Sequence, residues 1–290
     1  MNDVTAPDKR LNAYRPDLAA MELRDDVVAE RYTEGSAFHV TAPVVSLRRG
    51  PGFEFPQDSQ LLFGDNIRCF EEKDGWAWVQ NNRDGYVGYC PSSDLNTGTT
   101  NPTHLVSSAF SLIFPEPDIK RHPIFTLSLG SHVEIIEKNE KFSKLANGGW
   151  VYSRHLASRG VTQPDLAETA SKFLESPYLW GGNSYLGLDC SGLVQLALLR
   201  AGIMAKRDTD QQEYSVGESI TINADHSGLK RNDLVFWPGH VGIMMDDSSL
   251  IHANATDMKT SIAPLEKVSA HIKEIEGTEI SSIRRLEELA

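Results

Sequence analysis

The second half of the chain contains one cysteine and two histidines whose types and spacing could perform nucleophilic catalysis: Cys190, His240 and His252. Cys190 begins an apolar segment that predicts a helix to Ala201, followed by Gly202, a residue type favoured just after a helix end. A helix N-terminus carries partial positive charge and free N–H groups, which favour a thiolate and can bind an oxyanion. This position predicts that Cys190 is a nucleophile.

A thiolate nucleophile requires an imidazole that carries its proton and a further group that orients the imidazole. His240 and His252 both lie in segments that predict strands, and a hairpin between residues 241–245 and 249–252 would bring the two rings together. A lone cysteine or a lone histidine is more often structural than catalytic. The combination of the three residues favours catalysis.

The elements that would position these residues lie in residues 161–290. Apolar runs and turn residues predict two helices and four strands, over residues 164–174, 190–201, 233–237, 241–245, 249–252 and 280–285. A helix followed by antiparallel strands is an α+β pattern. We therefore expect Cys190 on a helix and both histidines on one sheet.

Three short motifs resemble, in order and approximate spacing, those of the NlpC/p60 cysteine peptidases, a papain-like family that acts on cell walls. The motifs are Asp-Cys-Ser-Gly-Leu at residues 189–193, Gly-His-Val-Gly at 239–242 and Ile-His-Ala at 251–253. The resemblance covers the chain from about residue 165 to about residue 285. It is the set of three motifs that is specific, because Gly-His-Val-Gly alone is a weak signal.

The resemblance implies a role for each residue of this constellation. Cys190 is the nucleophile, His240 is the general base and then the general acid, and His252 orients His240. Tyr178 occupies the family's tyrosine position, where its hydroxyl assists the oxyanion hole, and a buried structural tyrosine is the alternative. This chemistry requires no metal and no organic cofactor.

The first 160 residues contain no comparable motif. The segment from Asp17 to Tyr32 follows Pro16 and predicts a helix within an N-terminal arm, residues 1–35. Residues 36–98 and 99–160 each contain short apolar or alternating runs separated by Gly and Pro, a pattern typical of small barrels. These two stretches resemble bacterial SH3-like domains.

The predicted fold class is therefore α+β: a papain-like NlpC/p60 catalytic domain, residues 161–290, preceded by two small SH3-like β-barrels. Asp74-Gly75 and Asp84-Gly85 are hairpin signals within the first barrel. This domain order resembles the γ-D-glutamyl-L-diamino-acid endopeptidases of murein recycling. The resemblance implies a substrate in which L-Ala-γ-D-Glu is linked to a diamino acid, and cleavage after D-Glu.

In that subgroup the first barrel forms a wall of the cleft and helps to hold a free N-terminal L-Ala. A free α-amino group in a closed cleft must meet acidic or aromatic groups, because its desolvation is otherwise costly. Residues 207–212, Arg-Asp-Thr-Asp-Gln-Gln, resemble the subgroup's Arg-Asp-Ser-x-x-Gln, with Thr in place of Ser. A solvated loop acid is the favoured interpretation of Glu54. The full set of substrate-binding candidates is Tyr86, Glu54, Asp189, Ser191, Asp208 and Thr209.

Composition argues against several other classes of function. The chain has 290 residues and a net charge of −12, and an acidic surface repels phosphate backbones and anionic lipid. We therefore expect neither nucleic acid nor a membrane as partner. Three cysteines without CxxC or HExxH predict neither a disulfide framework nor a metal site. The first ten residues are polar and no apolar signal segment follows, so we expect a cytoplasmic protein whose partner is a murein peptide.

Three alternatives stay open. An exported hydrolase of intact wall would have to accept L-Ala capped by muramic acid, which a pocket for a free amine excludes. A wall- or peptide-binding protein would use its SH3-like modules beside an inert third domain, although Cys190 and His240 are both present. The same Cys–His pair could also perform amidase or transpeptidase chemistry, which only the products distinguish.

Overall fold

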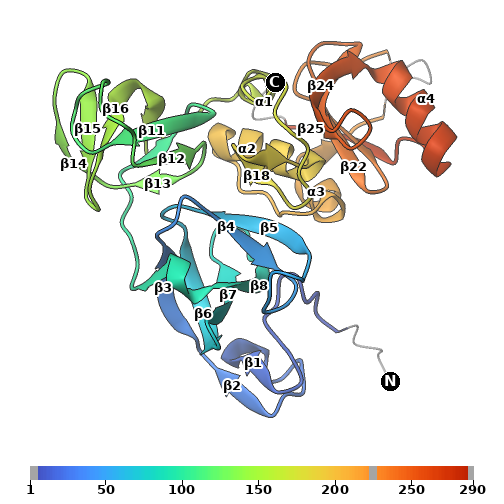
Figure 1. Cartoon of the computed structure of the whole chain (residues 1–290). Helices are drawn as coiled ribbons and strands as arrows, with labels where there is room; N and C mark the ends of the chain where they lie inside the picture. Colours follow the sequence, from blue (N-terminus) through green and yellow to red (C-terminus); the bar gives the residue numbers. More distant parts are fainter. Residues whose placement is uncertain (1–5, 222–226, 287–290) are drawn as a thin grey trace. The chain divides into compact units, whose positions relative to one another are not determined.

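The computed structural model describes residues 6–221 and 227–286 (Figure 1). The chain divides into two compact units. Residues 1–106 and 111–156 form the first unit, and residues 107–110 and 157–290 form the second. Each unit is described by itself below. No helix within the described ranges is long and apolar enough to cross a membrane.

The first unit contains a seven-stranded antiparallel sheet with the strand order β5-β4-β8-β7-β6-β3-β9. The Asp74-Gly75 hairpin is confirmed: both residues have positive φ (51° and 82°), and Lys73 pairs with Trp76. Alternate residues of these strands form one apolar core. The strands are β3 (Ser36–Val40), β4 (Val44–Arg48), β5 (Gln57–Leu62), β6 (Asn66–Lys73), β7 (Trp76–Asn81), β8 (Val87–Pro91) and β9 (Leu95–Thr97).

Two smaller sheets follow in the same unit, with the orders β12-β11-β16-β15-β14 and β13-β10-β17. Both halves of the unit end in the same way, with a strand, a 3-10 turn and a second strand. In the first half η2 (Ser92–Asp94) joins β8 to β9, and in the second half η3 (Ser153–His155) joins β16 to β17. No pairing within the described residues closes either half into a barrel, so the two-barrel interpretation stays a prediction. The strands are β10 (His104–Val106), β11 (Phe110–Phe114), β12 (Phe125–Ser128), β13 (His132–Val133), β14 (Ile135–Lys138), β15 (Phe142–Leu145), β16 (Trp150–Tyr152) and β17 (Leu156–Ser158).

The helix expected over residues 17–32 was a wrong prediction. β1 (Leu18–Ala20) pairs in parallel with β2 (Arg31–Thr33), and only a 3-10 turn, η1 (Met21–Leu23), lies between them. Residues 18–20 are all at least 97% buried, which an extended segment between two layers allows and an amphipathic helix does not. Packing of this segment against Phe70 and Trp78 therefore overrides the helix signal of Pro16.

The described residues of the second unit form four helices and a six-stranded antiparallel sheet of order β20-β25-β21-β22-β23-β24. Two short strands, β18 (Asn183–Ser184) and β19 (Gly187–Leu188), pair just before the second helix. The helices are α1 (Leu166–Ser171), α2 (Cys190–Ala201), α3 (Thr209–Ser215) and α4 (Leu265–Glu276). The sheet strands are β20 (Glu218–Ser219), β21 (Leu234–Trp237), β22 (His240–Met244), β23 (Ser249–Asn254), β24 (Lys259–Pro264) and β25 (Ser282–Arg285).

Helix α2 is the central element of this unit and has the limits that the sequence predicts. It packs against α1, β22 and β23, and ten of its twelve residues are buried. The Asp189 side chain accepts a hydrogen bond from the N–H of Gly192 at its start, and Gly202 (φ 86°) ends it in the left-handed conformation. Cys190 is therefore held in the first turn of a rigid, buried helix.

The backbone of Gly182 lies so close to Gly192 that we expect an alanine at position 192 to destabilise the protein. Gly to Ala inside a helix normally stabilises by about 1 kcal/mol. In Gly192→Ala, however, the new Cβ would clash with the backbone carbonyl of Gly182, and such overpacking costs about 1–3 kcal/mol. We expect a net loss in the free energy of unfolding, measured by urea denaturation. A gain in stability would show that the loop around Gly182 yields easily.

Candidate active site

Cys190 lies in a closely packed environment at the start of α2, with 7% of its surface exposed. Its Sγ lies 3.7 Å from Oγ1 of Thr209 and 3.9 Å from the carbonyl oxygen of Gly239. Burial, with a smaller contribution from Asp189, raises the pKa of the thiol to about 11, and the Thr209 hydroxyl opposes this shift. The thiol therefore stays neutral until a base accepts its proton.

The two histidines meet as the sequence predicts. His240 begins β22 and His252 lies in β23, and these neighbouring antiparallel strands bring Nε2 of His240 to 2.9 Å from Nδ1 of His252. The rings lie edge to face, with centroids 5.1 Å apart. Because Nε2 of His240 is used for this contact, Nδ1 is the nitrogen that remains for exchanging a proton with a nucleophile.

Both imidazoles are neutral at physiological pH. Burial, together with the neighbouring His252, lowers the pKa of His240 to about 3. Burial lowers the pKa of His252 to about 4. A neutral imidazole has a lone pair that can accept a proton, so His240 is in the state that a general base requires.

One cavity of about 580 Å³ brings the predicted catalytic side chains together. Cys190, His240, His252 and Tyr178 all line it. Burial and the nearby Cys190 and Asp189 raise the pKa of Tyr178, so its hydroxyl stays protonated and can donate to a developing oxyanion. The chemistry that this arrangement supports is attack by a thiolate on a carbonyl carbon.

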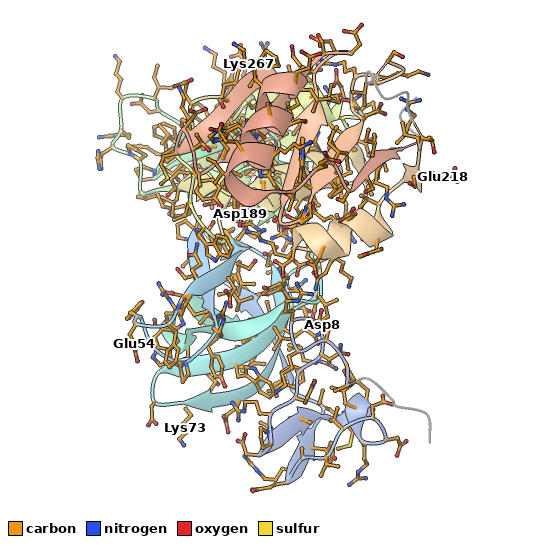
Figure 2. The ribbon with its side chains drawn as sticks, turned by 90° about the vertical axis from the view of Figure 1, so that its right-hand side faces the viewer. Asp8, Glu54, Lys73, Asp189, Glu218 and Lys267 are labelled. Carbon is orange, nitrogen blue, oxygen red and sulfur yellow. The ribbon has the colours of Figure 1, made fainter. Side chains whose placement is uncertain are left out.

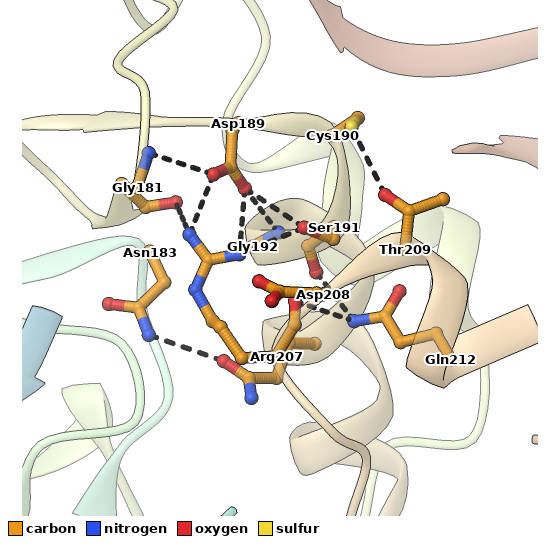
Figure 3. Close-up of polar contacts among 12 residues, drawn as sticks. Gly181, Asn183, Asp189, Cys190, Ser191, Gly192, Arg207, Asp208, Thr209 and Gln212 are labelled. Carbon is orange, nitrogen blue, oxygen red and sulfur yellow. Dashed lines mark hydrogen bonds and ion pairs between the residues drawn. The ribbon is translucent and has the colours of Figure 1, made fainter. Parts of the chain in front are cut away.

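A buried ion pair fixes the turn before the nucleophile (Figure 3). Arg207, 1% exposed, donates to both carboxylate oxygens of Asp189 at 2.9 and 2.7 Å. The same carboxylate accepts from the N–H groups of Gly181 (2.9 Å) and Gly192 (2.7 Å). Asp189, the residue before Cys190, therefore holds Cys190 in place. The contact of Asp189 with a substrate ammonium stays a prediction.

Arg207 also holds Ser191, the residue that follows the nucleophile. Its guanidinium donates to Ser191 Oγ at 2.8 Å, and the buried side chain of Gln212 donates to the Ser191 carbonyl at 2.9 Å. The role of Ser191 in substrate binding likewise stays a prediction. The sequence analysis named Arg207 only as part of the motif at residues 207–212. It did not predict the ion pair, because no local signal in the sequence indicates that Arg207 pairs with Asp189.

Asp208 and Thr209 stand where the chain enters α3. Asp208 is the N-cap residue, and its N–H donates to the Gln211 side chain at 3.4 Å. Thr209, the first residue of the helix, thereby directs its hydroxyl at Cys190. The structure brings Thr209 to the nucleophile, and the substrate contacts predicted for both residues stay predictions.

Tyr86 and Glu54 belong to the other compact unit. Tyr86 is 95% buried within the core of the seven-stranded sheet, and Glu54 lies in the exposed loop between β4 and β5 (Figure 2). Their predicted places at the cleft stay predictions. Within the described part of the chain, no group of three or more His, Cys, Asp or Glu side chains could hold a metal ion.

Comparisons with known proteins give two family matches. The NlpC/P60 family model matches residues 175–274, which include all three residues of the Cys–His–His set. The model of the bacterial dipeptidyl-peptidase Sh3 domain matches residues 47–95, in the seven-stranded sheet.

Similar proteins extend over most of the chain. Dipeptidyl-peptidase 6 of Lysinibacillus sphaericus is 26% identical over 271 residues, covering 85% of this chain and 98% of that protein. A γ-D-glutamyl-L-lysine dipeptidyl-peptidase of Bacillus cereus is 24% identical, covering 76% and 74%. The crystal structure of an NlpC/P60 family protein from Bacillus cereus has the same fold, with a TM-score of 0.71 at 21% identity, over 86% of this chain and 99% of that chain.

The contact between Thr209 and Cys190 predicts an effect on thiol reactivity. The Thr209 hydroxyl lowers the pKa of the Cys190 thiol, and Thr209→Val removes this hydroxyl while keeping the shape of the side chain. A hydrogen bond to a charged group is worth about 1.5–3 kcal/mol, so we expect at least tenfold slower alkylation of Cys190 by iodoacetamide at pH 8. Mass spectrometry identifies the modified cysteine, and Thr209→Ser is the control that keeps the hydroxyl. Equal rates in wild type and Thr209→Val would contradict this role.

The depressed pKa of His252 predicts a pH dependence of stability. The unfolded side chain titrates near pH 6.5, whereas the folded one titrates at about 4, so only the unfolded state binds this proton between those values. By linkage, the free energy of unfolding falls as the pH drops from about 6.5 to about 4, by up to about 1.4 kcal/mol per pH unit for this group. We expect a shallower fall in His252→Gln, measured by urea denaturation across this range. The same dependence of the free energy of unfolding on pH in wild type and His252→Gln would contradict this contribution of His252.

Proposed function

We propose that the chain is a cysteine endopeptidase of murein peptides with a free N-terminal L-Ala, because residues 175–274 match the NlpC/P60 family and residues 47–95 match the bacterial dipeptidyl-peptidase Sh3 domain. The bond cleaved is the one between the γ-carbonyl of D-Glu and a diamino acid. The observation that carries the proposal is the single cavity shared by Cys190, His240 and His252, with the two imidazoles in hydrogen-bond contact.

The first step forms the Sγ–C bond. The Cys190 thiol gives its proton to Nδ1 of His240, and the thiolate attacks the γ-carbonyl carbon of D-Glu. The carbonyl oxygen becomes an oxyanion next to the N-terminus of α2, within reach of the Tyr178 hydroxyl. Burial disfavours the thiolate and the imidazolium separately, so each is stabilised chiefly by the other.

The second step breaks the C–N bond and the third restores the enzyme. The His240 imidazolium gives its proton to the departing amine of the diamino acid, leaving a thioester on Cys190. Water then gives a proton to His240 while its oxygen attacks the thioester carbon. The C–S bond breaks, the thiolate regains its proton, and the acyl product leaves as L-Ala-D-Glu with a free γ-carboxylate.

Two further observations support the substrate. Relatives that cover most of the chain are named as dipeptidyl-peptidases, two of them γ-D-glutamyl-L-lysine dipeptidyl-peptidases. Asp208 is the N-cap carboxylate of α3 and precedes Thr209, whose hydroxyl contacts Cys190, and we propose that it meets the substrate ammonium. Peptides with a free L-Ala arise during turnover of the wall, so we propose a role in recycling murein peptides inside the cell.

Product analysis by mass spectrometry tests this proposal. Wild type is incubated with L-Ala-γ-D-Glu-meso-diaminopimelate and with its N-acetylated form. We expect L-Ala-D-Glu from the free peptide alone, and loss of more than about a thousandfold in rate for Cys190→Ala, because the nucleophile is absent. Cys69→Ala, which removes another buried cysteine in the other unit, is the matched control and stays active.

The other outcomes favour the alternatives. Cleavage of both peptides would remove the free-amine requirement and favour a hydrolase of intact wall. Cleavage of neither would favour a binding protein, and a new amide product in place of hydrolysis would favour acyl transfer.

A further inference from the structure

The catalytic cavity continues beyond the histidine pair. From His240 and His252 it follows the turn after β23, residues 254–257, and then the face of α4, the red helix in Figure 1. Thr209, which contacts Cys190, is not among its lining residues. The cavity therefore extends from the nucleophile on the side that carries the histidines.

The position of His240 decides which half of a substrate enters this extension. A general acid must lie within hydrogen-bond reach of the nitrogen that it protonates. The acyl half stays bonded to Cys190, so the departing half must lie past His240, along residues 254–257 and α4. The volume of about 580 Å³ falls in the range of about 300–1,000 Å³ that small-ligand sites occupy.

Side chains of both charges line this extension. Lys267 lies on α4 (Figure 2), one turn before His271, so the two share a face of the helix. Asp257, in the turn after β23, also lines the cavity, and its carboxylate accepts from the neutral side chains of Ser261 (3.2 Å) and Asn254 (3.5 Å). Glu276, near the other end of α4, is a second acidic residue of the lining, and Asp257 is the one that follows β23. A ligand that carries both charges could therefore meet Lys267 and Asp257 here.

Lys267 is an exposed residue of α4 whose charge has no partner among the ion pairs of the described residues. It forms no ion pair within residues 6–221 and 227–286, and it occupies the first turn of α4, where a positive charge opposes the helix dipole. Lys273 on the same helix shows the contrast: it pairs with Glu279 at 2.6 Å, lies in the last turn and does not line the cavity. The charge of Lys267 is thus available to an anion in the cavity.

Building on the proposed function, we propose that Lys267 and Asp257 form a subsite for the side-chain end of the departing diamino acid, and that this end carries both a carboxylate and an ammonium group. Lys267 binds the carboxylate and Asp257 binds the ammonium. Diaminopimelate has both groups at that end. Lysine has the ammonium alone, which would leave Lys267 beside a like charge. The chain therefore selects diaminopimelate peptides over lysine peptides.

Steady-state kinetics on two peptides test this subsite. The substrates are L-Ala-γ-D-Glu-meso-diaminopimelate and L-Ala-γ-D-Glu-L-Lys, and the readout is the ratio of their kcat/KM values in the full chain. We expect wild type to favour the first peptide at least tenfold, as one charge-assisted hydrogen bond permits. Lys267→Gln is expected to lower the ratio about tenfold, mainly through KM of the diaminopimelate peptide. Lys267→Arg keeps the cation and the preference, and Lys273→Gln is the matched control on α4.

Each other result overturns a distinct statement. Equal cleavage of both peptides by wild type, or a ratio that Lys267→Gln leaves unchanged, overturns the subsite while the proposed function stands. Equal losses on both peptides in Lys267→Gln assign Lys267 to folding or general binding and also overturn it. Cleavage of neither peptide by wild type overturns the proposed function and the subsite together.

Discussion

The buried ion pair between Arg207 and Asp189 is the interaction on which the candidate active site depends. A charge out of water is costly unless it is paired and hydrogen-bonded, and here the Asp189 carboxylate receives the guanidinium and two backbone N–H groups. Those N–H groups belong to the loop before α2 and to the first turn of α2. The pair therefore joins the loop, the helix and the segment that leads into α3 around the nucleophile between them.

The sheet supplies the other half of the site with a different constraint, its register. In an antiparallel sheet a shift of one residue would turn a side chain to the opposite face. Ile243 pairs with Ile251 and Met244 with Leu250, and this register aligns His240 and His252 on one face. The apolar residues that flank the histidines hold the register because they belong to the core. The hydrogen-bond contact between the two imidazoles is thus a product of ordinary hydrophobic burial.

The parts that the sequence predicts correctly are those whose signals are local. The helix over 190–201 has a clear end at Gly202, and the strands of the two histidines are close enough along the chain to form a hairpin. Helix α4 and β24 were not predicted, although Leu265, Val268 and Ile272 recur at helical spacing and Gly277 follows the helix, which is a local signal that the sequence analysis did not use. The helix expected over 17–32 was wrong because contacts with Phe70 and Trp78, distant in sequence, decide its conformation. For the same reason no sequence pattern indicated that Arg207 pairs with Asp189, and the roles of individual residues came from the family resemblance.

The partner of His240 is an imidazole that burial keeps neutral, and this has a consequence for the order of proton movements. A carboxylate behind a catalytic histidine would stabilise the imidazolium throughout the cycle. In the proposed mechanism the main stabilising charge is instead the anion that forms on the reacting atoms. Once that anion collapses toward the thioester, the imidazolium loses its counter-charge and becomes a much stronger acid. The acid is therefore strongest at the moment when the departing amine needs its proton, and the timing is set by the reaction itself.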